Sequence, residues 1–203
     1  GALTTDEFRQ HWPSAGMLRA SGGGYRRNPG TIPAAVITDP DFWWLIGLYL
    51  AEGYRHCLRS NRGRYWSHVH RVAFCLNPDS DAASIVRLKD AVRRLFHRSP
   101  SHVSKARHTC EIVFNSEQMC EVLEVFGARA HDKHLPGWVF NLPASLHTEL
   151  VHGYVQGDGT MGTRSRTGLS IACVSVSLQL LRDMQRVLLL LGVYSTLSHL
   201  RGA

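Results

Sequence analysis

Two carboxylates occupy matching positions in two similar segments of this 203-residue chain. The segments are "LIGLYLAEG" (45–53) and "LVHGYVQGDG" (150–159), and in each the acid, Glu52 or Asp158, follows a small residue and precedes a glycine. Two converging carboxylates supply the oxygen ligands that hard cations such as Mg²⁺ prefer. A cation held in this way can activate water and stabilise the leaving oxygen during phosphodiester hydrolysis. This chemistry requires a fold that brings the two acids together.

Both segments predict a helix that ends at its acid. Asp39 and Ser145 are candidate N-caps, and apolar residues follow them at helical spacing. A single acid before a glycine is more often an ordinary helix end, but two occurrences in matching frames favour a shared function. Small residues four apart let two helices approach closely, so we expect the helices to pack together with both acids at one end. These small residues are Gly47, Ala51, Gly153 and Gly157.

The segments that follow the two acids also correspond to each other. Each acid is followed by a strand-like alternation and then by an amphipathic helix, and the two copies are offset by 106 residues. We therefore predict an α+β fold built from a duplicated helix–strand–strand–helix–strand–strand unit, with the second copy incomplete at its C-terminal end. The predicted parts are a linker or DNA-contacting arm (1–38), a first subdomain (39–130) and a second subdomain (131–203).

The charge of the chain favours a polyanionic partner. Its 23 Lys and Arg against 16 Asp and Glu give a net charge of +7, and only Lys89, Lys105 and Lys133 are lysines. Arginine suits bidentate contacts with phosphates and guanine edges. A solvated basic face would have the same composition, so charge alone leaves both readings open.

The cysteines and the apolar runs limit the class of protein further. The five cysteines are odd in number and contain no close CxxC pair, which fits neither a disulfide framework nor a zinc knuckle, so we expect buried free thiols. The longest apolar run, "VLLLLGV", is too short to span a membrane, and the N-terminus lacks a signal peptide. We therefore expect a soluble protein in the cytoplasm.

The two acid segments resemble a known family. Both segments, the unit that separates them and "DKHLPGWVFNLP" before the second segment are similar to the LAGLIDADG, or dodecapeptide, homing endonucleases, particularly the single-chain type carried inside inteins. The resemblance covers roughly residues 40–200. It implies a duplicated αββαββα fold, a pseudo-two-fold monomer whose two antiparallel sheets form a saddle over DNA.

The resemblance also implies a reaction and its site. A monomer of this family cuts double-stranded DNA at a long, rare target, with two or more Mg²⁺ ions at the scissile phosphates. Glu52 and Asp158 stand where the family has its metal-binding acids, and Lys133 in "KHLP" stands where the family has an active-site lysine. A lysine there would stabilise charge on the phosphorus centre or position the attacking water.

Strand residues are the predicted DNA contacts. In a sheet packed on helices, alternate side chains face away from the helices and are available to the major groove. Most such contacts would position the protein on phosphates, and a minority would read bases. The candidates are Arg55, Arg59, Arg62, Arg64, Tyr65, His68, His70, Lys105, Arg107, Arg164, Arg166, Ser175 and Ser177.

Three alternatives remain open from the sequence. The same scaffold can serve as a cleavage-deficient DNA-binding regulator or an RNA-splicing maturase, and two departures keep this open: the first acid is Glu52, and no lysine follows Lys133. His68 and His70 on one strand could bind a transition metal, although no third ligand lies at a recognisable spacing. Trp43 and Trp44 are expected in the core rather than as a platform for bases.

Overall fold

The structure is a computed structural model, and it is described here for residues 38–62, 65–106, 108–163 and 169–198. The first half contains α2 (Pro40–Glu52), β1 (Gly53–Arg62), β2 (Tyr65–Leu76), α3 (Ala82–Phe96), β3 (His102–Ala106), β4 (Thr109–Asn115) and α4 (Glu117–Glu124). The second half contains the short 3₁₀ helices η1 (Ala130–Asp132) and η2 (Gly137–Asn141), then α5 (Ala144–Asp158), β5 (Thr160–Thr163), β6 (Leu169–Ala172) and α6 (Leu178–Leu190). The α+β class predicted from the sequence is confirmed.

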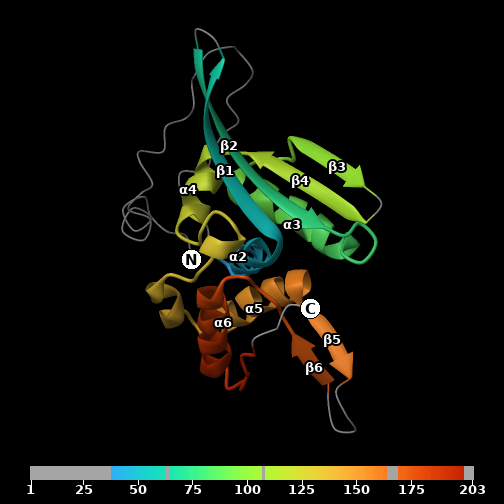
Figure 1. Ribbon diagram of the computed structural model, residues 1–203, viewed down its shortest axis with the longest axis vertical. Coiled ribbons are helices and arrows are strands. Elements are labelled where there is room, and N and C mark those ends of the chain that lie inside the picture. Colours follow the sequence, from blue (N-terminus) through green and yellow to red (C-terminus); the bar gives the residue numbers. More distant parts are fainter. Residues whose placement is uncertain (1–37, 63–64, 107, 164–168, 199–203) are drawn as a thin grey trace.

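The first half is built on an antiparallel sheet in the order β1-β2-β4-β3. Val72 and Phe114, which are paired across β2 and β4, are fully buried on the face that the helices cover. The paired strands β1 and β2 extend far beyond this body as a long hairpin, while β5 and β6 form a separate two-stranded sheet (Figure 1). In the view of Figure 1, β3 and β4 lie above and to the right of the central helices, and β5 and β6 lie below and to the right of them.

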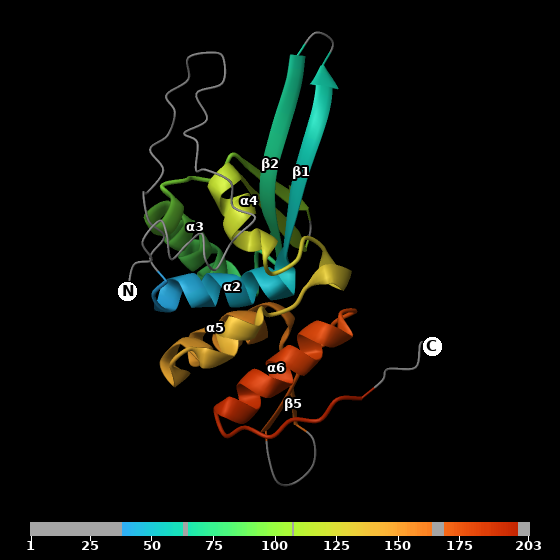
Figure 2. The same ribbon diagram turned by 90° about the vertical axis from the view of Figure 1, so that its left-hand side faces the viewer.

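Helix α2 is the centre of the molecule. Every residue from Phe42 to Leu50 is buried, although helical periodicity alone indicates a single apolar stripe. The reason is that α2 is enclosed: α5 packs along one side, and α3, α4 and the large sheet lie on the other (Figure 2). Trp43 and Trp44 are both buried in this core, as expected. Among the described residues, no helix is long and apolar enough to cross a membrane.

The helices α2 and α5 meet through two glycines in reciprocal contacts. A Cβ atom added to Gly47 would overlap the Leu150 carbonyl oxygen, and one added to Gly153 would overlap the Trp44 carbonyl oxygen. Gly153 lies 106 residues after Gly47, and Leu150 lies the same distance after Trp44, so each contact is the symmetry mate of the other. The predicted close packing of the two helices through small residues is therefore present in the structure.

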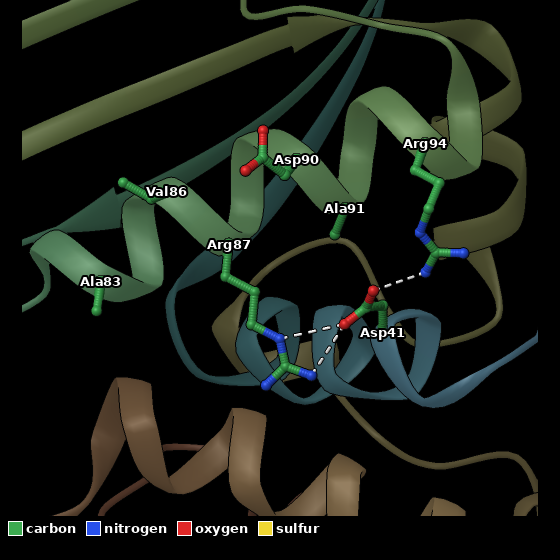
Figure 3. A pocket seen from close by; sticks show the side chains of 7 residues that line it. All are labelled: Asp41, Ala83, Val86, Arg87, Asp90, Ala91 and Arg94. Atoms are coloured by element: carbon green, nitrogen blue, oxygen red, sulfur yellow. Dashed lines mark hydrogen bonds and ion pairs between the residues drawn. The ribbon is translucent and has the colours of Figure 1, made fainter.

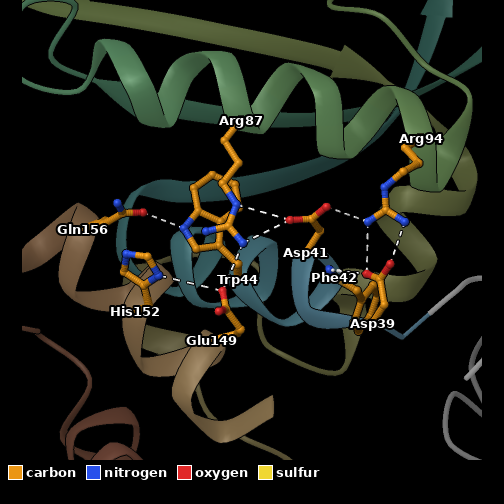
Figure 4. Close-up of polar contacts among 9 residues, drawn as sticks. All are labelled: Asp39, Asp41, Phe42, Trp44, Arg87, Arg94, Glu149, His152 and Gln156. Carbon is orange, nitrogen blue, oxygen red and sulfur yellow. Dashed lines mark hydrogen bonds and ion pairs between the residues drawn. The ribbon is translucent and has the colours of Figure 1, made fainter. Parts of the chain in front are cut away.

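Arg87 of α3 fastens the other end of this helix pair. Its guanidinium donates hydrogen bonds to Asp41 of α2 and to Glu149 of α5, both at 3.0 Å from Nη2 (Figure 4). The same group lies 4.4 Å from the ring centre of Trp44, whose indole Nε1 donates to Gln156 of α5. A single arginine thus connects three helices, with its charge satisfied by two carboxylates and an aromatic face.

A surface pocket lies beside this arginine (Figure 3). Arg94 closes one end of it through ion pairs with Asp39 and Asp41. The pocket is about 16 Å along α2 from Glu52, at a rise of ~1.5 Å per residue, so we assign it no part in chemistry at the acids. It is lined by Asp41, Ala83, Val86, Arg87, Asp90, Ala91 and Arg94.

The second half departs from the sequence-based expectation after β6. The sequence predicts a strand through residues 168–176, but β6 ends at Ala172, and the chain then runs without regular structure to α6. Ser177 is buried and caps α6, because its Oγ accepts a hydrogen bond from the Leu180 amide. Ser175 accepts a hydrogen bond from the Ser177 amide. The prediction that these two serines stand on a DNA-facing strand is therefore wrong.

Candidate metal centre and nucleic-acid interface

The two predicted acids converge at the C-terminal ends of α2 and α5. Gly157, which precedes Asp158, is so close to α2 that an added Cβ would overlap the Ala51 methyl group and lie 3.0 Å from Cγ of Glu52. The small residues before each acid thus make the room that lets the carboxylates approach each other. Each helix also directs the negative end of its dipole toward this point, which adds to the field that attracts a cation.

Burial and mutual repulsion perturb both acids. Burial, followed by the negative charge of Asp158, raises the pKa of Glu52 to about 7, and Lys133 opposes this rise. Burial also raises the pKa of Asp158, again opposed by Lys133. Two half-buried carboxylates that repel each other form a site whose free energy falls when a cation binds between them.

Lys133 is the third predicted member of the site, and it is buried beside the acids. Its Nζ lies 3.4 Å from the Ala51 carbonyl oxygen and 5.4 Å from the ring centre of Tyr49. Burial lowers the pKa of Lys133 to about 8, while Asp158 and Glu52 act in the opposite direction. The ammonium group is therefore mostly protonated at neutral pH. The prediction that Glu52, Asp158 and Lys133 lie together agrees with this geometry.

Two polar residues that the sequence reading assigned to other roles or missed hold Lys133 in place. Ser177 Oγ donates a 2.7 Å hydrogen bond to the Lys133 carbonyl, and Asp183 accepts a 2.9 Å hydrogen bond from the Leu135 amide. Both side chains are buried, one at the N-cap of α6 and one within it. Their partners are more than forty residues away in the chain. An isolated buried aspartate on an amphipathic helix is the only sequence signal that could have indicated this anchor.

The donor set fits a hard divalent cation. Glu52 and Asp158 offer carboxylate oxygens, and the carbonyl of Ala51 lies beside them, near Lys133. Magnesium commonly binds one or two protein carboxylates and completes its shell with water and substrate phosphates. A site of two acids at the edge of the protein meets that requirement and leaves coordination positions for a phosphodiester.

The pairing register decides which strand residues face away from the helices. Arg55 is paired with Val72 and Cys57 with His70, so these residues share the face on which the buried Val72 packs. Arg55 also forms an ion pair with Glu124 of α4 at 3.6 Å. The expected open-face position is therefore wrong for Arg55 and His70, because the alternation of the strand directs them toward the helices.

The same register orders the remaining candidates. Arg59 and His68 are paired with each other and follow the helix-side alternation, as does Lys105, which is paired with the buried Cys110. Arg62 and Tyr65 are paired in the opposite alternation, so their role in DNA binding stays a prediction. Arg64, Arg107, Arg164 and Arg166 lie outside the described residues.

The sequence reading missed residues that stand on the open face. Arg71 is paired with Asn115 and His56 with Arg71, and all three belong to the alternation opposite to Val72. Arg71 Nη2 donates a 3.0 Å hydrogen bond to Glu111, and Tyr54 donates to the same carboxylate. Arg71 is basic and lies in a strand-like alternation, so counting the alternation outward from the apolar Val72 would have found it.

Comparison with known proteins identifies the fold. Residues 145–202 match the family described as LAGLIDADG-like domain. The solved structure of I-DmoI in complex with DNA and Mn superposes with a TM-score of 0.57 over 79% of this chain and 82% of that chain, at 13% identity. The chain has the LAGLIDADG homing-endonuclease fold. The family resemblance inferred from the two acid segments is thus confirmed.

Sequence relatives of this LAGLIDADG chain are much longer proteins. The chain is 26% identical over 155 residues to a DNA gyrase subunit from Mycobacterium kansasii, which covers 74% of this chain and 26% of the relative. It is 28% identical over 167 residues to a DNA polymerase of a Thermococcus species, which covers 81% of this chain and 8% of the relative. The chain therefore corresponds to a small part of each relative.

Proposed function

We propose that this chain is a metal-dependent endonuclease that hydrolyses double-stranded DNA at a long, specific site. The observation that carries the proposal is the meeting of Glu52 and Asp158 at the ends of a symmetric helix pair, with Lys133 buried beside them. The neighbouring fold structures include I-DmoI complexes with DNA and Mn and with DNA and Ca, which supports a DNA substrate and a divalent ion.

The chain's own residues would act by position and charge. Glu52 and Asp158 would hold Mg²⁺, which when bound supplies Lewis-acid stabilisation of the scissile phosphate and a more acidic water. Lys133, fixed by α6 and protonated at neutral pH, would stabilise negative charge that develops on the phosphoryl oxygens. The open face of the large sheet would hold the duplex so that a phosphate lies at the acids.

We further propose an intein context and a monomeric state. Gyrase and polymerase relatives that match over a small fraction of their length are expected if the shared segment is an endonuclease inserted in a host protein. A single chain already supplies both acids, so a monomer has a complete pair. The use of two or more Mg²⁺ ions and a cytoplasmic location stay predictions.

The test is cleavage of a random duplex library in Mg²⁺ and binding to the same library in Ca²⁺. We expect discrete cuts with the unmodified chain, and Asp158→Asn should abolish cutting, by about 10²-fold or more, while DNA affinity changes little. The reason is that asparagine keeps the shape of the side chain but removes the charge that holds the cation. Asp90→Asn, on the exposed face of α3, is the matched control and should cut normally.

Two outcomes distinguish the proposal from its alternative. Equal loss of binding and cutting in Asp158→Asn would count against a role in catalysis. Selective binding without cuts in the unmodified chain would favour the cleavage-deficient regulator, for which the longer Glu52 side chain is the motivating observation.

A further inference from the structure

Two cysteines and a histidine face one another where α4 packs against the base of the long hairpin. Cys57 is on β1, His70 is on β2 and Cys120 is on α4, and the three candidate ligand atoms all lie within 4.8 Å of one another. The Cys57 sulfur is 3.9 Å from Nδ1 of His70. In the part of the chain that is described, this is the cluster of three whose side chains suit a soft metal ion.

The fold, rather than sequence spacing, assembles this cluster. Cys57 and His70 are directly paired across the hairpin and project from the same face of the sheet. Helix α4 is tied to that position because the Ser116 amide donates a 3.0 Å hydrogen bond to the His70 carbonyl, and Ser116 also caps the helix. One turn later, Cys120 points into the interface and is buried. No short CxxC or HxH spacing reveals such a site.

A carboxylate orients the histidine from behind. Nε2 of His70 lies 3.7 Å from Oε1 of Glu117, so the other ring nitrogen, Nδ1, is the one directed at Cys57. Histidines that bind metals in proteins commonly donate their second ring N–H to a carboxylate, which fixes the ring and raises its basicity. Glu121, next to Cys120, has a buried carboxylate oxygen with no hydrogen bond to the described part of the protein, which adds negative charge at the same place.

We propose that Cys57, His70 and Cys120 bind one Zn²⁺ ion, with water in the fourth position on the exposed side of Cys57. In a tetrahedral site with Zn–S of about 2.3 Å and Zn–N of about 2.0 Å, sulfur and nitrogen are about 3.5 Å apart, so a small contraction of the observed cluster suffices. The ion would connect β1, β2 and α4 and so fasten the base of the hairpin to the body. This proposal does not depend on the proposed endonuclease activity.

One group competes with the ion for the Cys57 sulfur. Nη1 of Arg55 donates a hydrogen bond to it at 3.6 Å. The same guanidinium lies 3.6 Å from Glu124, and that carboxylate keeps Arg55 paired when the sulfur turns to the metal. The net charge at the site also favours a dication, because two thiolates and nearby Glu117 and Glu121 outnumber the single arginine.

Cobalt titration of the reduced protein tests the site without DNA. Co²⁺ bound to cysteine thiolates gives an intense charge-transfer absorption that oxygen ligands do not give, so binding at Glu52 and Asp158 is silent in this measurement. We expect one equivalent to bind with this absorption and one equivalent of Zn²⁺ to displace it. Cys57→Ser and Cys120→Ser should each abolish the band, and Glu117→Gln should weaken binding about tenfold.

The controls separate the proposed site from the rest of the chain. Cys173→Ser, which removes a half-buried thiol in the second half, and Asp158→Asn should both retain the band. Circular dichroism should show that Cys57→Ser is folded, because Cys57 is exposed. Zinc should raise the melting temperature of the unmodified chain and leave that of Cys57→Ser unchanged.

Three results would overturn the proposal. The first is the absence of a thiolate charge-transfer band at stoichiometric cobalt. The second is an unchanged band in Cys57→Ser or Cys120→Ser. The third is a Cys57–Cys120 disulfide in protein purified without reductant, combined with no cobalt binding after reduction, which would make the pair a redox linkage instead.

Discussion

Glu52 and Asp158 occupy equivalent positions but differ by one methylene, and their surroundings are also unequal. Glu52 is affected by burial, by Asp158 and by Asp81, whereas Asp158 is affected by burial and Lys133. Without a cation, the folded protein therefore holds a carboxylate that resists ionisation. A residue arranged for metal binding is expected to destabilise the metal-free fold in this way.

This arrangement predicts how stability depends on pH. The pKa of Glu52 is raised from 4.5 to about 7 in the folded state, so the folded protein binds more protons than the unfolded chain between these values. Stability should then fall as pH rises from about 4.5 to 7 and change little from this group above that range. Glu52→Gln should remove this contribution and stabilise the metal-free protein at pH 8 by about 1 kcal/mol, allowing for solvent screening.

The measurement is urea denaturation in EDTA at several pH values. Repeating it with Mg²⁺ should reduce the difference between the two proteins, because the cation relieves the repulsion in the unmodified chain. Glu111→Gln, on the sheet, is a comparison carboxylate outside the acid pair. An identical pH dependence in the unmodified chain and Glu52→Gln would contradict the assignment.

The acids and Lys133 could be predicted from the sequence because their chemistry is local to two short, recognisable segments. The supporting residues could not, since their partners are remote: Ser177 contacts Lys133, and Arg87 contacts Asp41 and Glu149. A polar side chain gives no indication in the sequence of which distant backbone or carboxylate it will meet.

At the level of elements, the pairing of α2 with α5 determines where the acids meet. The reciprocal contacts of Gly47 and Gly153 leave no space for a side chain, because the obstructing atoms belong to the backbone of the facing helix. Neither helix can shift locally without moving its acid. The helix pair and the site are therefore mechanically the same object.

A methyl group at this contact should separate the helices. Gly153→Ala should destabilise the protein by about 2 kcal/mol or more through overpacking, in spite of the better helix propensity of alanine. Gly137→Ala is the matched control, because no atom lies within 4 Å of the added Cβ. Urea denaturation compares the two. Equal midpoints for Gly153→Ala and the unmodified chain would show that the helices can move apart freely.

The helices and the strands of the first half follow from periodicity, but the faces of the hairpin do not. Basic residues of β1 and β2 were expected on the open face, whereas Arg55 and His70 project toward α4. A shift of one residue in register exchanges the two faces of a strand. Composition indicates that a hairpin is basic, and only the pairing shows which residues point outward.

At the scale of the whole molecule, the open face of the large sheet is the proposed contact with DNA, and a pair of arginines tests it. Arg71→Ala should weaken binding at low salt and reduce the salt dependence of the binding constant by about one counterion, a slope change of ~0.9. Arg55→Ala, on the covered face, should leave that slope unchanged and lower stability instead. Fluorescence anisotropy at several salt concentrations measures both.

The reverse result, in which Arg55 and not Arg71 sets the salt dependence, would place the DNA on the other side of the sheet. No change in either variant would limit DNA contact to other parts of the chain. Because both residues are arginines on neighbouring strands of one sheet, differences in net charge cannot explain a difference between them.

The unequal length of the two hairpins has a consequence for the target itself. The ten residues of β1 extend about 33 Å at ~3.3 Å per residue, close to ten base pairs or one helical turn of DNA. The four residues of β5 extend only about 13 Å, or roughly four base pairs. We therefore expect the information content of the recognition site to be lopsided, with one half-site tolerating few mismatches and the other many.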